Sequence, residues 1–151
     1  MFSLFDTKIV DFVKSHTKAV IATVDTLNQP STSMIFYVVD KNNDMYFVTK
    51  SMTTKSENLK QNNKSAITIA DESKPITVSI TGVVLEIEEQ KKRDEIMQDV
   101  FKLSYSELHD YAPIIKLHKG SFEVMKFVPK QAKMTDFTKP MGEAKEDLKK
   151  Y

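Results

Sequence analysis

Hydrophobic residues follow two different periods along this chain. Between Ser3 and His16 they recur every three or four residues, the spacing of one helical face, and Ser3 is the expected N-cap. A second helical pattern runs from Glu88 to Leu103, with charged residues on the opposite face. The capping pair Thr54 and Glu57 predicts the start of a third helix.

Elsewhere the apolar residues alternate with polar ones or form short β-branched runs, which is typical of strands. Strands are predicted at residues 19–24, 31–39, 45–49, 65–70, 76–87, 121–128 and 131–137. Turn-forming residues separate several of them, among them Asp25–Pro30 and Asp40–Asp44, and Pro129 is expected to end the strand before it. Gly82 interrupts the longest strand, which indicates a bulge or a barrel corner.

The order of these elements favours one fold class. Strands that follow one another across short turns pair in antiparallel fashion, and the predicted helices are few and peripheral. We therefore expect a mainly β fold, a small closed or split β-barrel, mostly antiparallel, with flanking helices. Residues 1–137 are expected to form a single domain, and residues 138–151 a charged, loosely ordered tail.

The composition narrows the possible functions. The 151 residues include 22 basic and 21 acidic ones, and this even balance gives no field that would attract nucleic acid or an anionic membrane. The absence of cysteine excludes disulfides, thiolate catalysis and cysteine-ligated zinc. The N-terminus has no signal-peptide pattern and the chain no membrane span, so we expect a cytoplasmic protein.

Neither a metal site nor a catalytic side chain is indicated by the spacing of the candidate residues. The three histidines, His16, His109 and His118, are far apart in sequence, so ordinary surface or hydrogen-bonded histidines are expected. The methionines at positions 34, 45 and 52 would suit the wall of a ligand cleft, but packing in the core is their expected role.

The segment Thr49–Glu57 carries the clearest chemical signal. It is rich in hydroxyl groups, follows a predicted strand and opens a predicted helix, with Lys55 in the first helical turn. The free N–H groups and the positive end of a helix dipole attract phosphate, and Lys55 adds a formal positive charge. An ordinary Ser/Thr-rich helix cap with a solvated lysine has the same pattern, so the segment alone leaves both interpretations open.

An ordered series of short motifs surrounds this segment. It comprises Asn28-Gln29-Pro30, Met34-Ile35-Phe36-Tyr37, Phe47-Val48-Thr49, Thr53-Thr54-Lys55, Leu59, Asn62 and Ile76–Gly82. In order and spacing the series resembles the FMN-binding core of the pyridoxamine 5′-phosphate oxidase-like family. The likeness covers about two-thirds of the chain, and it becomes less sharp from Phe122 to Phe137.

The resemblance implies a split barrel that forms a homodimer, with FMN in clefts at the subunit interface. Thr49 and Lys55 match phosphate-binding positions, and Thr77 matches a polar position that reaches the flavin from the other subunit. The full set of cofactor-binding residues implied by the likeness is Ser33, Met34, Ile35, Val48, Thr49, Thr53, Thr54, Lys55 and Thr77.

The sequence also departs from the oxidase. Ser33 and Thr54 stand where the oxidase has arginine, Val38 stands where a lysine holds substrate, and the chain has no tryptophan. The closer likeness is to the general-stress-protein-type branch, and the oxidase reaction on pyridoxamine phosphate is not expected. Two classes stay open: an FMN-dependent oxidoreductase with an unknown small substrate, or a non-catalytic binder of a flavin, haem or deazaflavin. No side chain is assigned as catalytic, because a flavin carries the redox chemistry itself.

Overall fold

A closed antiparallel barrel forms the body of the molecule. The computed structural model describes residues 5–107, 121–139 and 149–150. Neighbouring strands pair in the order β3-β2-β1-β4-β5-β6-β7, and an additional pairing of β3 with β6 closes the barrel. The strands are β1 (Lys18–Val24), β2 (Pro30–Val39), β3 (Met45–Lys50), β4 (Lys64–Ala70), β5 (Ile76–Glu86), β6 (Phe122–Asp136) and β7 (Lys149–Lys150).

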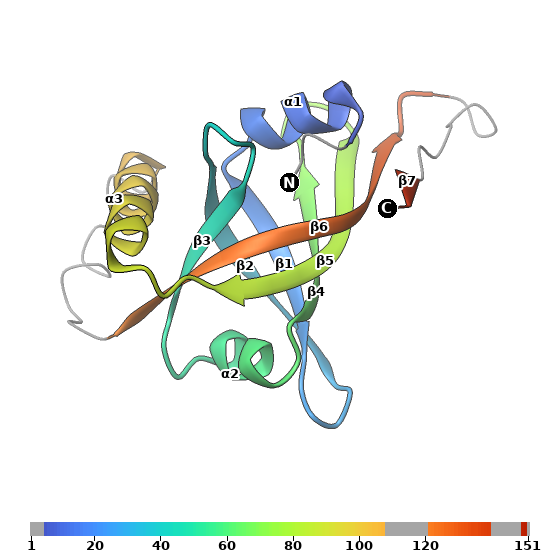
Figure 1. Ribbon diagram of the computed structural model, residues 1–151. Coiled ribbons are helices and arrows are strands. Elements are labelled where there is room, and N and C mark those ends of the chain that lie inside the picture. Colours follow the sequence, from blue (N-terminus) through green and yellow to red (C-terminus); the bar gives the residue numbers. More distant parts are fainter. Residues whose placement is uncertain (1–4, 108–120, 140–148, 151) are drawn as a thin grey trace.

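Three helices flank the barrel in the described part of the chain: α1 (Thr7–Ser15), α2 (Thr54–Gln61) and α3 (Gln90–Glu107). Figure 1 shows α1 over one end of the barrel, α2 at the other end and α3 beside β3. The predicted mainly β, mostly antiparallel barrel with flanking helices is therefore confirmed. No helix among the described residues is long and apolar enough to cross a membrane.

The barrel interior holds the main hydrophobic core. Apolar side chains of every barrel strand meet there, and α1 and α2 contribute Ile9, Val13 and Leu59 from the two ends. The buried Tyr37 hydroxyl donates a 2.7 Å hydrogen bond to the carbonyl oxygen of Val13, which ties α1 to β2. Burial also raises the pKa of Tyr37 far above its ordinary value, so this hydroxyl keeps its proton.

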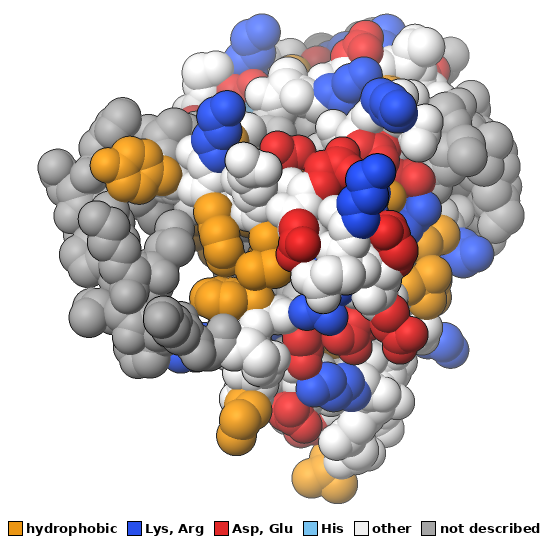
Figure 2. Space-filling view, turned by 60° about the vertical axis from the view of Figure 1, so that its left-hand side comes forward, with side chains coloured by type: hydrophobic (Ala, Val, Ile, Leu, Met, Phe, Trp, Pro, Cys, Tyr) orange, Lys and Arg blue, Asp and Glu red, His pale blue; other side chains and the backbone are white. Residues whose placement is uncertain are grey.

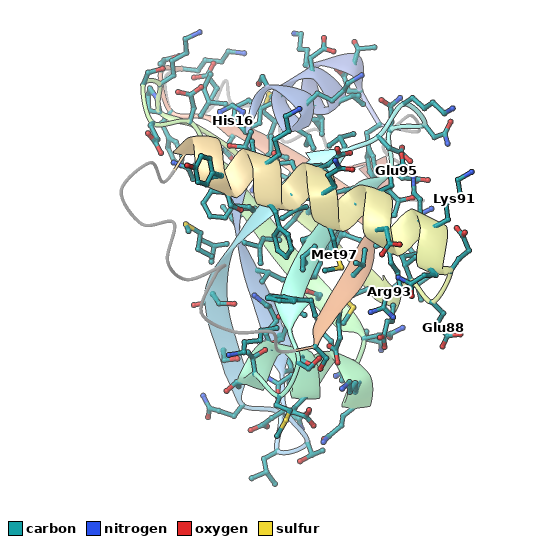
Figure 3. All side chains as sticks on the ribbon, turned by 90° about the vertical axis from the view of Figure 1, so that its left-hand side faces the viewer. His16, Glu88, Lys91, Arg93, Glu95 and Met97 are labelled. Carbon is teal, nitrogen blue, oxygen red and sulfur yellow. The ribbon has the colours of Figure 1, made fainter. Side chains whose placement is uncertain are left out.

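A second, smaller core lies outside the barrel, under α3. Ile96 and Val100 of this helix pack against Tyr46 of β3 and Val124 of β6. Acidic and basic side chains are interspersed over the face that α3 presents to solvent (Figures 2 and 3). This arrangement confirms the amphipathic pattern that the sequence shows between Glu88 and Leu103.

Several element boundaries differ from the prediction. Asp6 is the N-cap of α1, where its side chain accepts from the Lys8 N–H, and Ser3 lies outside the described residues. Thr53 caps α2 in place of Thr54, because its hydroxyl reaches the N–H of Ser56. The strands predicted at 121–128 and 131–137 are one strand, β6, that continues through Pro129.

A bulge explains why Pro129 does not end β6. Gly82 of β5 pairs with Pro129 of β6, and Thr81 pairs with Gln131. The register therefore shifts by one residue, and Lys130 is the extra residue of the bulge. A Cβ atom at position 82 would collide with the backbone carbonyl oxygen of Val128. Glycine at this position therefore allows the two backbones to approach closely at Pro129, which has no N–H to donate. The irregularity predicted at Gly82 is confirmed.

The chain around the two ends of β6 is described only in part. Residues 108–120, 140–148 and 151 lie outside the described residues, and with them most of the segment that was expected to form a loose tail. Within that segment, Lys149–Lys150 pairs as β7 with Gln131 and Ala132 of β6.

The outward face of β1, β2, β4 and β5 is almost free of charge. Register pairing places Val20 beside Met34 of β2 and Thr68 of β4, and Thr68 in turn beside Ser79 of β5. Val20 is 47% exposed and Met34 is 55% exposed. We call this surface the uncharged sheet face; it consists of Val20, Ala22, Thr32, Met34, Ala66, Thr68, Ala70, Thr77, Ser79 and Thr81.

Candidate functional site

A cavity opens where β2 and β3 separate. The two strands pair only at Tyr37–Phe47, Val38–Tyr46 and Val39–Met45, so the earlier half of β2 has no partner on that side. The space between them is about 540 Å³. It is lined by Ser31, Thr32, Ser33, Val48, Thr49, Lys50, Thr53, Thr54 and Lys55.

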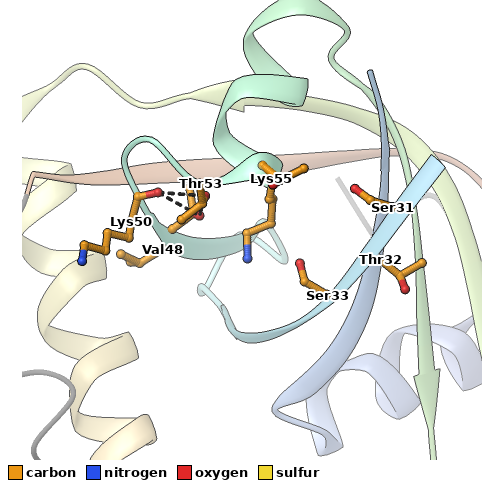
Figure 4. Close-up of a pocket in the computed structure, with 9 residues that line it drawn as sticks. Ser31, Thr32, Ser33, Val48, Lys50, Thr53 and Lys55 are labelled. Atoms are coloured by element: carbon orange, nitrogen blue, oxygen red, sulfur yellow. Dashed lines mark hydrogen bonds between the residues drawn. The ribbon is translucent and has the colours of Figure 1, made fainter. Parts of the chain in front are cut away.

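The N-terminus of α2 closes one side of this cavity (Figure 4). The Thr53 hydroxyl accepts from the N–H of Ser56 at 3.2 Å, and the Thr53 carbonyl accepts from the N–H of Glu57 at 2.9 Å. The N–H groups of Thr54 and Lys55 therefore have no acceptor among the described residues. Two free N–H groups at the positive end of a helix are a ready site for an anion.

The threonine hydroxyls near this helix terminus are partly engaged. Thr53 Oγ1 donates to the carbonyl oxygen of Lys50 at 3.0 Å while it accepts from Ser56. Thr49 Oγ1 lies 3.4 Å from both the Lys50 carbonyl oxygen and Thr53 Oγ1. Thr53 is thus a structural cap, whereas the hydroxyl of Thr54 on the same helix turn forms no hydrogen bond with the described residues.

Lys55 is the charged group most closely associated with the cavity. Its side chain is half-buried, and it forms no ion pair or hydrogen bond with any described residue. Burial lowers the pKa of Lys55, so the apoprotein bears a cost for holding this charge. Figure 4 shows the side chain extending from α2 toward Ser33 of β2, whereas the exposed Lys50 extends in another direction.

An ion pair between the buried Glu123 of β6 and the exposed Lys60 of α2 fixes α2 beside β6. Ser56 Oγ donates to Glu123 Oε2 at 2.6 Å, and Lys60 Nζ lies 2.7 Å from Glu123 Oε1. Burial raises the pKa of Glu123, but the hydrogen bonds from Lys60 and Ser56 outweigh it and hold the pKa below its usual range. Glu123 faces Thr49 in the register of β3 and β6, so the helix that closes the cavity is anchored to one of its walls.

The structure brings six of the nine predicted cofactor-binding residues to the cavity: Ser33, Val48, Thr49, Thr53, Thr54 and Lys55. The other three lie elsewhere. Ile35 is 3% exposed and packs inside the barrel. Met34 and Thr77 belong to the uncharged sheet face, because alternation turns them away from their buried neighbours Ile35 and Val78.

Three cavity residues were not predicted: Ser31, Thr32 and Lys50. Thr32 and Lys50 are direct neighbours of predicted residues, Ser31 lies two positions before Ser33, and the hydroxyls that follow Pro30 were a usable signal. The expected core packing of the methionines holds for Met45, which is fully buried. It is wrong for Met34 and for Met52, which is 89% exposed in the loop before α2.

His16 is a satisfied histidine, as predicted. Its Nδ1 lies 2.7 Å from the carbonyl oxygen of Phe12, and its Nε2 lies 3.3 Å from Asp71 Oδ2. Hydrogen bonds from Ser73 lower the pKa of Asp71 to about 2. His109 and His118 lie outside the described residues. The described residues contain no group of three or more side chains that could hold a metal ion.

The cavity therefore combines a cationic, donor-rich end with a strand whose edge is unpaired. Lys50 and Lys55 are the ionisable side chains among its described lining residues, and both are basic. Such a site can hold a phosphate monoester and place whatever the phosphate carries along β2. It offers no carboxylate or imidazole as a general base.

Comparisons with known proteins agree with this architecture. The family model described as pyridoxamine 5′-phosphate oxidase matches residues 5–136. No curated protein sequence matches the chain.

Solved structures with the same fold share little sequence with this chain. A protein related to general stress protein 26 from Clostridium acetobutylicum has a TM-score of 0.68 at 15% identity, over 97% of this chain and 96% of that one. A putative pyridoxamine 5′-phosphate oxidase from Listeria innocua has a TM-score of 0.62 at 17% identity, over 85% and 95%. A haem binding protein from Mycobacterium smegmatis has a TM-score of 0.66 at 17% identity, over 93% and 55%.

Proposed function

This chain belongs to the pyridoxamine 5′-phosphate oxidase family, and we propose that it binds FMN in the cavity between β2 and β3. The phosphate would lie at the N-terminus of α2, and the flavin ring would extend along the unpaired half of β2. The bound flavin would supply hydride or electron transfer, which makes the protein an oxidoreductase for a small substrate.

The observation that carries this proposal is the half-buried Lys55, which has no ion-pair or hydrogen-bond partner among the residues that the structure describes. A partly desolvated ammonium without a counter-ion lowers stability, so its position at a cavity favours an anionic ligand there. The free N–H groups of Thr54 and Lys55 lie on the same helix turn, and together they fit a single phosphate. The described residues of the chain therefore suit the phosphate of FMN.

A dinucleotide flavin fits this site less well than FMN. A pyrophosphate is usually held by a glycine-rich turn of the type Gly-x-Gly-x-x-Gly, and this chain has three glycines in total and no such motif. Mass spectrometry of the cofactor released from purified protein tests this point. FMN as the main species supports the proposal, and FAD as the main species contradicts it.

The uncharged sheet face supports a homodimer. A surface that combines exposed Val20 and Met34 with small polar side chains is suited to burial against a second copy. Thr77 lies on this face, so the face that a partner would cover also carries the residue expected to reach the partner's flavin. FMN and dimer would then stabilise each other by mass action.

Sedimentation of apo and FMN-loaded protein across a dilution series tests the homodimer. Dissociation of the dimer should release flavin, because each site would need both subunits. A monomer that keeps FMN at full occupancy would exclude a shared interface site.

In this proposal the protein's own residues bind and orient the cofactor and do not exchange protons with the substrate. Lys55 would neutralise the phosphate, and Val48 would offer an apolar contact beside it. Reduction is tested by the loss of visible flavin absorbance when NADPH or NADH is added to the purified protein. A yellow protein that neither nucleotide bleaches would favour a non-catalytic flavin-binding or deazaflavin-binding role.

Haem binding is the second candidate, favoured by the fold shared with the haem binding protein from Mycobacterium smegmatis. The cationic end of the cavity would suit a haem propionate. The described cavity residues include no histidine, cysteine, methionine or tyrosine that could serve as an axial ligand, which favours flavin. Absorption spectra after incubation with haemin or FMN distinguish the two, since ligated haem gives a sharp Soret band.

A further inference from the structure

We infer that Ser31 donates a hydrogen bond to the bound flavin and that Asn58 is the positioning residue that directs it. This inference rests on the proposed FMN site and adds a contact on the wall opposite Lys55. It arises from three polar side chains on α2, β1 and β2 that meet beneath the cavity.

The three groups form a closed triangle of contacts. Asn58 Nδ2 of α2 lies 3.1 Å from Thr23 Oγ1 of β1 and 3.3 Å from Ser31 Oγ of β2. Thr23 Oγ1 and Ser31 Oγ lie 3.3 Å from each other. Thr23 is 2% exposed and Asn58 is 6% exposed, whereas Ser31 lines the cavity.

Counting hydrogens assigns a direction to each contact. An amide nitrogen carries two hydrogens, and a hydroxyl carries one hydrogen and accepts up to two. The Asn58 amide nitrogen donates to both Thr23 and Ser31, so a single hydroxyl hydrogen occupies the third side of the triangle.

The buried hydroxyl must be the one that supplies this hydrogen. Thr23 has no acceptor other than Ser31 among the described residues, and an unused hydrogen inside the barrel would be costly. Ser31 then accepts from both Thr23 and Asn58, and its own O–H hydrogen is directed out of the triangle into the cavity.

Ser31 is therefore a donor toward any ligand, with no capacity left to accept. Its partner would be an oxygen acceptor of the flavin, either on the phosphate or on the ribityl chain and ring. A hydroxyl held in one orientation loses no rotational freedom on binding, which strengthens the contact compared with a free serine. Asn58 acts through Ser31 and does not itself line the cavity.

Fluorescence titration of apoprotein with FMN and with riboflavin tests the inference. Ser31→Ala should weaken FMN binding about tenfold, the effect of one lost hydrogen bond at a ligand site, and Ser31→Thr should retain affinity because it keeps the hydroxyl. A loss confined to FMN would place the acceptor on the phosphate, and an equal loss for riboflavin would place it on the rest of the flavin. Unchanged FMN affinity in Ser31→Ala would overturn the contact.

A double-mutant comparison tests the role of Asn58. Asn58→Leu has a similar shape but no donors, and it should weaken FMN binding about as much as Ser31→Ala. In the Ser31→Ala background the same change should have no further effect on affinity. An equal loss in both backgrounds would show that Asn58 acts only through the fold, and would overturn its positioning role.

A matched control and a second readout keep the outcome clear. Ser65→Ala removes a serine hydroxyl that donates at 2.8 Å to the Ala22 carbonyl oxygen, away from the cavity, and should leave FMN affinity unchanged. Urea denaturation of each apoprotein reports folding, and if Asn58→Leu does not fold, the Ser31 variants alone decide the contact. If the unmodified protein binds neither FMN nor riboflavin, it is the proposed function that fails.

Discussion

Replacing Lys55 with methionine should change FMN affinity and apoprotein stability in opposite directions. Methionine keeps the length of the side chain but removes its charge. Lys55 is half-buried and has no described partner, so it gains a counter-ion only when the phosphate binds. Binding should therefore weaken, while the folded apoprotein is relieved of a partly desolvated charge.

The size of the binding effect follows from the type of contact. A charge-assisted hydrogen bond to a partly buried partner contributes about 1–3 kcal/mol. A change of 1.4 kcal/mol is a factor of ten in the dissociation constant, so Lys55→Met should weaken FMN binding by about 5- to 150-fold. Riboflavin carries no phosphate, and its affinity should be almost unaffected.

The effect on stability has a definite sign and pH dependence. Burial lowers the pKa of Lys55 in the folded protein below its value of 10.5 in the unfolded chain. Between the folded-state pKa and the unfolded-state pKa, the unfolded chain binds more protons than the folded protein. The stability of the unmodified apoprotein relative to the variant should therefore rise with pH across that interval. Below the interval, where Lys55 is charged in both the folded and the unfolded chain, Lys55→Met should be at least as stable as the unmodified protein in urea.

Fluorescence quenching of FMN and riboflavin by the apoprotein provides the assay. Lys50→Met is the matched control, because Lys50 lines the same cavity but is exposed and extends away from Lys55. Its loss of FMN affinity should be clearly smaller, since an exposed charge is screened by solvent. Equal losses for FMN and riboflavin, or no loss in Lys55→Met, would refute the phosphate contact.

Three further predictions concern the framework of the site. Gly82→Ala should destabilise the fold by about 1–3 kcal/mol in urea, because the added Cβ collides with the Val128 carbonyl oxygen; an unchanged midpoint would mean that the bulge relaxes freely. The pKa of Asp71 is lowered to about 2, so its contribution is complete above 3.8 and is lost as pH falls through about 2. Asp71→Ala should therefore destabilise the protein at pH 7 and differ less from the unmodified protein in acid, and a constant difference in denaturation midpoint would contradict this. Val20→Asp places a charge in the uncharged sheet face and should yield monomers that release FMN, whereas a dimer in sedimentation would show that another surface pairs.

The sequence allowed the strands to be predicted because each has a local pattern. Ile76–Glu86 alternates buried and exposed residues, and the hairpin turn at Asp40–Asp44 is rich in turn-forming side chains. The continuity of β6 could not be predicted, because it depends on a glycine of another strand opposite Pro129. A proline by itself predicts the end of a strand. Only the pairing of β5 with β6 shows that the strand continues through Pro129 by forming a bulge.

The candidate site was predictable to the same degree. The segment Thr49–Lys55 was found because its strand, loop and helix terminus are contiguous. The hydrogen-bond direction at Ser31 could not be predicted, because it depends on Asn58, which is remote in sequence. The expected core packing of Met34 was wrong, although strand alternation with the apolar Ile35 already indicated opposite faces.

The closure of the barrel has a consequence for how the chain matures. The residues that line the cavity all lie between Ser31 and Lys55, but β3 is held in the barrel by β6, where Thr49 faces Glu123. The contact that closes the barrel is thus distant in sequence, and contacts of that kind form slowly. During synthesis the whole cavity wall would leave the ribosome well before the strand that holds it in place. A nascent chain that ends before β6 should therefore be unable to retain the cofactor, and cofactor capture would follow completion of the barrel.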